Sequence, residues 1–79
     1  MLEKDKREIE RLTKVAIKPR WASDLFAQAI AIDVIAAYGS AAIPALIEIS
    51  QRATSGATRK HALDRITQLK RKYPQGSEL

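Results

Sequence analysis

Cysteine is absent from this chain of 79 residues, and histidine occurs once. No disulfide can stabilise the fold, and His61 stands alone without the three or more donors that a metal site needs. Aromatic residues account for only 5% of the sequence, which leaves base stacking on aromatic side chains unsupported. The lack of cysteine fits a reducing environment, and we expect a cytoplasmic protein that needs no cofactor.

Long apolar runs are missing as well. The longest, residues 25–37, is interrupted by Gln28 and Asp33 and is too short to span a bilayer. Residues 1–12 are densely charged, and no apolar run follows their basic side chains, so we expect no signal peptide. These features predict a protein that does not interact with membranes.

Glycine and proline occur three times each, and they punctuate segments with apolar residues at helical spacing. Pro19 ends a first helix that covers about residues 2–17. Gly39 favours the left-handed backbone that ends a second helix, and Ser40 is placed to cap a third.

A turn-forming link at residues 54–56 precedes a fourth helix that ends near Lys72, and Ser55 or Thr54 is placed to cap it. No segment shows the alternation of a β-strand, so we predict an all-α fold of four short helices in a single domain. The expected units are two antiparallel helical hairpins and a frayed tail, at about residues 2–38, 40–72 and 73–79.

The charge is uneven along the chain. Residues 1–20 carry +3 and residues 59–79 carry +4, whereas residues 21–58 between them carry −2. The net charge of +5 favours acidic partners or phosphates through long-range attraction. On the exposed side of the first helix, Glu10 and Lys14 have the four-residue spacing of an ion pair.

The second helix is apolar on every side, since Asp24, Gln28 and Asp33 are its only strongly polar residues. Such a helix in a water-soluble protein is buried all round. Two interpretations stay open: the other helices cover it completely, or part of its surface meets a second copy or another protein. For the second case we predict association through a set of apolar residues: Leu25, Phe26, Ala29, Ile32 and Ala36.

Two separate segments share a pattern, because residues 31–35 and 62–66 both carry Ala, Asp and Ile at their first, third and fifth positions. In the same alignment Ile32 matches Leu63. The distance between the two copies is that of a helical hairpin, and both copies have helical spacing, so the recurrence predicts two stacked helical hairpins.

Residues 39–49 resemble the first helix of a HEAT-like repeat. Residues 57–66 are similar to its second helix, in which an Arg precedes a buried Ala by three positions, as Arg59 precedes Ala62 here. The first pair of helices matches more loosely, with Gln28 at the position of the Arg. The resemblance implies a helical scaffold that binds proteins, and sometimes nucleic acid, and that is seldom catalytic.

Two repeats are fewer than the three or so that stacked arrays need to bury a continuous core. The chain is therefore expected to be a fragment, a terminal cap or a unit that completes its core by association. We predict a non-enzymatic protein–protein interaction module that forms a homo-oligomer. No catalytic residue is predicted: His61 should be solvated, and Asp33 and Asp64 should make surface or interhelical hydrogen bonds.

A small DNA-binding protein is the alternative. The third helix, residues 54–56 and the fourth helix also resemble a helix-turn-helix, in which the fourth helix contacts DNA. That motif buries the positions held here by Arg52 and Arg65, and burial of two unpaired guanidinium groups is unfavourable. For contacts with nucleic acid or other anions we predict the basic side chains of the fourth helix: Arg59, Lys60, Arg65, Arg71 and Lys72.

Overall fold

Four α-helices and one short 3₁₀-helix make up this computed structural model, which describes residues 2–18 and 25–73. In chain order the elements are α1 (Glu3–Ile17), α2 (Leu25–Ala36), the 3₁₀-helix η1 (Gly39–Ala42), α3 (Ile43–Arg52) and α4 (Gly56–Lys72). The predicted all-α fold of four helices is confirmed. The predictions about Pro19 and about residues 74–79 of the tail lie outside the described residues.

The turns after α2 and after α3, which the structure describes, match the sequence prediction except at one residue. Gly39 has a φ of 76°, the left-handed conformation expected of it. Ser55 caps α4, because its hydroxyl accepts a hydrogen bond from the backbone N–H of Thr58 at 3.5 Å. The prediction that Ser40 caps the third helix is wrong, because Ser40 lies inside η1 and its carbonyl accepts from the N–H of Ile43. The chain enters α3 through this tighter helical turn, without a side-chain cap.

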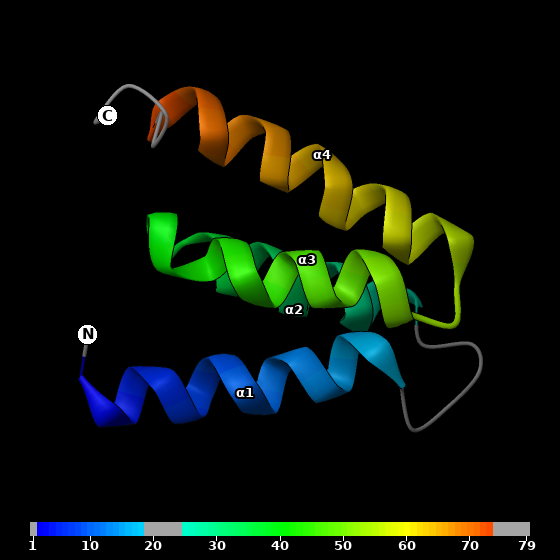
Figure 1. Ribbon diagram of the computed structural model, residues 1–79. Coiled ribbons are helices and arrows are strands. Elements are labelled where there is room, and N and C mark those ends of the chain that lie inside the picture. The colour runs from blue at the N-terminus through cyan, green and yellow to red at the C-terminus, as the bar shows by residue number, and fades with distance from the viewer. Residues whose placement is uncertain (1, 19–24, 74–79) are drawn as a thin grey trace.

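The helices pair as two hairpins, α1 with α2 and α3 with α4. Between the hairpins, α1 also contacts α3, and α2 contacts α4. Figure 1 shows α1 and α4 along the two outer edges, with α2 and α3 between them. At one end, a backbone hydrogen bond from the N–H of Thr54 to the carbonyl of Ile17, at 3.2 Å, joins the two hairpins.

The core draws apolar side chains from every helix. Ile32 and Ile35 of α2 and Leu46 and Ile49 of α3 are its largest fully buried members. Burial of a side chain of this size stabilises the fold by about 1.5–3 kcal/mol relative to an exposed one. The other members are Ile9, Ala16, Ala31, Ala36, Ala42, Ile43, Ala53, Ala62, Ile66 and Leu69.

One buried amide links the two hairpins. Gln28 of α2 donates from Nε2 to the carbonyl of Ala16 in α1 at 2.7 Å. Its Oε1 accepts a hydrogen bond from the hydroxyl of Thr58 in α4 at 3.0 Å. These two hydrogen bonds join α1, α2 and α4 through a single side chain. Breaking either of them would leave a buried polar group without a partner, which costs about 1–3 kcal/mol.

The alignment that the sequence predicted agrees with burial at some positions and not at others. Ala31 and Ala62 are both buried, and so are Ile35 and Ile66. Ile32 is fully buried, yet Leu63, its match in the predicted alignment, is 52% exposed. When the alignment is shifted by a single position, Gln28 matches Thr58 and Ile32 matches Ala62, and all four are buried. The same shift sets the buried Ala31 and Ile35 against two half-buried residues of α4, so neither alignment fits every pair. Both alignments bring buried residues together, because α2 buries a wide arc of its surface whereas the buried residues of α4 form one narrow side.

Candidate functional site

The exposed side of α2 is apolar. Phe26 is 78% exposed, Ile30 47% and Val34 41%, and their four-residue spacing places them in one row along the helix. Helices α1, α3 and α4 pack against the other sides of α2. In residues 2–18 and 25–73 no other helix carries three large exposed apolar side chains. We call these three residues the α2 row.

Only part of the predicted association surface is accessible. Phe26 is exposed and Ala29 is half-buried, but Ile32 and Ala36 lie in the core. A partner that docks on the folded domain cannot reach the last two, and their inclusion is corrected. The side chain of Leu25 lies outside the described residues. Ile30 and Val34 were missed, because a helix without a polar side gives no sign of which face its neighbours will cover.

An ionic cluster lies beside the α2 row, where α2 meets α4. His61 Nε2 lies 2.9 Å from Asp33 Oδ1, and Arg65 Nε lies 3.1 Å from the same oxygen. Arg65 also donates from Nη1 to Gln68 Oε1 at 2.7 Å. The interhelical bonding predicted for Asp33 is confirmed, whereas His61 is not simply solvated as predicted, because α2 brings a carboxylate within its reach. Asp64 is exposed and forms no ion pair within the described part of the chain.

The basic residues predicted for anion contact do not form one free surface. Arg59 donates from Nη1 to the carbonyl of Ala53 at 2.7 Å, and Arg65 belongs to the ionic cluster with Asp33. Two of the five predicted side chains are therefore held by bonds within the chain. The other three are exposed on α4: Lys60, Arg71 and Lys72.

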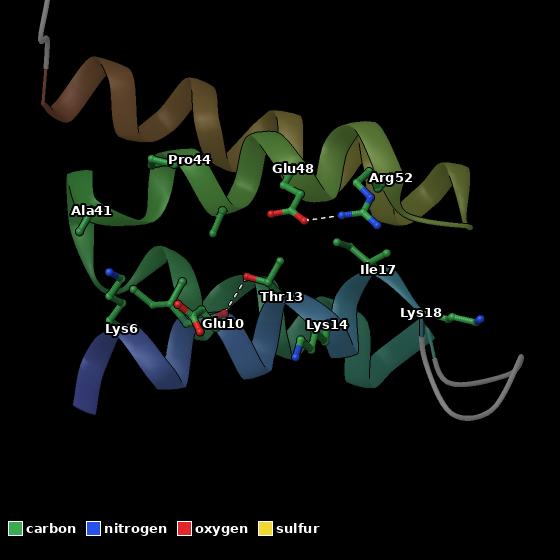
Figure 2. A pocket seen from close by; sticks show the side chains of 12 residues that line it. Lys6, Glu10, Thr13, Lys14, Ile17, Lys18, Ala41, Pro44, Glu48 and Arg52 are labelled. Carbon is green, nitrogen blue, oxygen red and sulfur yellow. Dashed lines mark hydrogen bonds and ion pairs between the residues drawn. The ribbon is translucent and has the colours of Figure 1, made fainter. Parts of the chain in front are cut away.

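A groove of about 860 Å³ separates α1 from α3 (Figure 2). Ile9 and Ile17 of α1 face Ala41 of η1 and Pro44 and Ala45 of α3 across an apolar floor. The last three side chains are small, which leaves the groove open between the two helices. The sequence did not predict this groove, because the pattern of one helix does not show which neighbour its margins will face. Charged side chains form the rims: Lys6, Glu10, Lys14, Lys18, Glu48 and Arg52.

Among the residues described, no group of three or more His, Cys, Asp or Glu side chains is placed to hold a metal ion. No described helix is long and apolar enough to cross a membrane.

Comparison of the chain with protein-family models, with curated proteins and with solved structures finds no match. Two apolar surfaces of the described residues remain as candidate contact sites, the α2 row and the groove.

Proposed function

We propose that this protein is a non-enzymatic interaction module that self-associates through the α2 row. The observation that carries the proposal is the exposure of Phe26, Ile30 and Val34 on one side of the most apolar helix. Apolar surface removed from water contributes about 25 cal/mol per Å². A contiguous exposed apolar patch on a small domain therefore marks a contact site.

A second copy of the chain is the partner that the charges favour. Asp33 is the only charged residue of α2, and it already pairs with His61 and Arg65 of its own chain. Two α2 helices can therefore meet without bringing uncompensated like charges together, although each chain carries +5. A two-fold axis buries the same row on both chains, which is the commonest geometry of soluble oligomers.

The stacking of the helices supports a minimal HEAT-like unit as part of this proposal. The first helices of the two hairpins, α1 and α3, are neighbours, and so are the second helices, α2 and α4. Stacked helical repeats have this arrangement. Two hairpins bury less surface than a longer array, and association through α2 adds burial that the single chain lacks.

Sedimentation equilibrium over a wide range of concentration tests the proposal. We expect the wild-type chain to associate as its concentration rises and Ile30→Glu to remain monomeric, because burial of the new carboxylate in the interface is unfavourable. Ile30 is 47% exposed, so this variant leaves the core intact.

Leu63→Glu is the matched control for Ile30→Glu. Leu63 is 52% exposed, about as much as Ile30, but it lies on α4. It is one turn after Arg59, whose side chain bonds to the carbonyl of Ala53 at the end of α3, so Leu63 lies on the side of α4 that is near α3. We expect this variant to associate like the wild type. A wild-type chain that is monomeric at every concentration, or an equal loss of association in both variants, would contradict the proposal.

DNA binding through α4 has less support. The helices of a helix-turn-helix cross at about 90–120°, whereas α3 and α4 lie alongside each other over much of their length in Figure 1. Electrophoretic mobility shifts at low and high salt test this alternative. Binding that is lost at high salt and in both Lys60→Glu and Arg71→Glu would favour it over the interaction module.

A further inference from the structure

We propose that the groove between α1 and α3 binds an acidic amphipathic helix of a partner protein. The groove is lined by α1 and α3, together with Lys18 at the end of α1 and Ala41 of η1, and no residue of α2 lines it. Figure 2 shows α2 behind the groove. Its use does not depend on the α2 row, so this inference goes beyond the proposed self-association.

The floor of the groove suits apolar side chains. Thr13 is the polar residue on it, and its hydroxyl already donates to the carbonyl of Ile9 at 2.6 Å. An apolar partner residue can therefore cover Thr13 without leaving the hydroxyl unpaired. The hydrogen bond between Thr54 and Ile17 lies at one end of the groove, and Figure 2 shows Lys6 and Ala41 at the other.

The charge of the rims favours an acidic occupant. On the α3 side, Glu48 and Arg52 pair with each other at 2.7 Å. On the α1 side no ion pair among the described residues holds a lysine, and the predicted pair of Glu10 with Lys14 does not form. Such exposed pairs contribute only a few tenths of a kcal/mol, so Lys14 can turn to a partner at little cost. The three free lysines are Lys6, Lys14 and Lys18. Glu10 on the same rim is also outside these ion pairs, so three positive charges stand against one negative charge there.

The spread of these lysines favours a helix over a small anion. At 1.5 Å per residue, Lys6 and Lys18 lie about 18 Å apart along α1, which equals roughly three helical turns. A phosphate or a single carboxylate needs donors that converge on one point, and these lysines do not converge. A helix laid along the groove can place apolar residues on the floor at intervals of three and four, and its carboxylates beside the lysines.

Fluorescence anisotropy with two labelled peptides of about 14 residues, long enough for this span, tests the proposal. One peptide carries Leu at helical spacing on one side and Glu on the other. The second has the same composition in an order that forms no apolar side. We expect the amphipathic peptide to bind and the reordered one to bind about tenfold more weakly or less.

Two variants and a control locate the site. Lys14→Glu should weaken binding about fivefold through charge reversal, and Ala41→Trp should weaken it about tenfold by filling the groove. Lys14 and Ala41 are exposed, so both variants should fold, which circular dichroism checks. Lys4→Glu is the matched control, because Lys4 is exposed on the same helix but does not line the groove. Its affinity should stay within about twofold of the wild type.

Equal binding of the two peptides, equal affinities of Lys14→Glu and Lys4→Glu, or undiminished binding to Ala41→Trp would overturn the assignment. Loss of peptide binding in Ile30→Glu would place the peptide on the α2 row and overturn it too. A DNA duplex that binds with sensitivity to Lys14→Glu and Ala41→Trp, when the peptide does not bind, would replace the acidic helix by nucleic acid. Sedimentation of Lys14→Glu should match that of the wild type, which separates this test from self-association.

Discussion

Helices α2 and α4 are the second helices of their hairpins, yet they meet water in opposite ways. Helix α2 has one charged residue, Asp33, and an exposed row of large apolar side chains. Helix α4 has seven charged residues, and its buried positions form one narrow side. The difference shows that helices at equivalent positions in two hairpins need not have equivalent roles. The exposed surface of α4 is charged, as is typical of a helix that faces water, whereas α2 exposes an apolar side suited to a contact.

The largest expected effect on stability distinguishes α2 from α4 at Ile32 and Leu63, which match in the alignment predicted from the sequence. Ile32→Ala should lower the free energy of unfolding by about 2–5 kcal/mol, because it leaves a cavity in the core. Leu63→Ala should lower it by about 0.5 kcal/mol or less, because Leu63 is 52% exposed. Urea unfolding followed by circular dichroism, at one low protein concentration so that association does not contribute, measures both. Similar losses in the two variants would mean that the helices are buried alike.

The next largest effect compares Gln28 of α2 with Arg59 of α4, since each side chain donates a hydrogen bond to a backbone carbonyl that precedes its own helix. Gln28→Leu should lower the free energy of unfolding by about 1–3 kcal/mol, because the carbonyl of Ala16 and the hydroxyl of Thr58 lose a buried partner. Arg59→Leu should lower it by about 1 kcal/mol or less, because its bond to Ala53 lies at a partly exposed site. The same urea titrations measure both losses.

A double variant provides the control for the buried amide. Adding Thr58→Val to Gln28→Leu removes the unpaired hydroxyl, so the double variant should recover part of the loss. If the effects of the two substitutions simply add, the two side chains are not coupled, and the bridge contributes less than its geometry indicates.

The smallest effect concerns the two aspartates of the fourth and second helices. Asp33→Asn should lower the free energy of unfolding by about 0.2–1 kcal/mol, because Asp33 pairs with His61 and Arg65 at a largely solvated site. The loss should shrink as salt is added. Asp64→Asn serves as the control and should change stability little. Equal and salt-independent effects of the two substitutions would contradict a role for the ionic cluster.

The sequence predicted α4 better than α2, for a physical reason. In α4 the apolar residues Ala62, Ile66 and Leu69 stand at helical spacing among polar ones, and all three are buried. In α2 nearly every position is apolar, so packing against three neighbours decides which side chains are covered. Ile32 and Ile30 look equally suited to either environment in the sequence, yet one is fully buried and the other is 47% exposed.

Contacts between hairpins were the other part that the sequence could not supply. The ionic cluster of Asp33 and Arg65 and the groove between α1 and α3 both join residues far apart in the chain. Helical periodicity shows how the residues of one helix share a face. It does not show which helix comes to lie opposite that face.

The bridge made by Gln28 determines the register of the two hairpins. A slide of one helix along its neighbour by one turn, about 5.4 Å, would keep much of the contact between Ala and Ile side chains, because these residues recur at one-turn spacing. It would break the hydrogen bonds of Gln28, whose amide is held at both ends by Ala16 and Thr58. A single buried polar side chain can select one alignment among several of similar hydrophobic free energy. In this protein the apolar residues supply the stability, and the buried amide, together with the other polar contacts between the hairpins, favours one alignment.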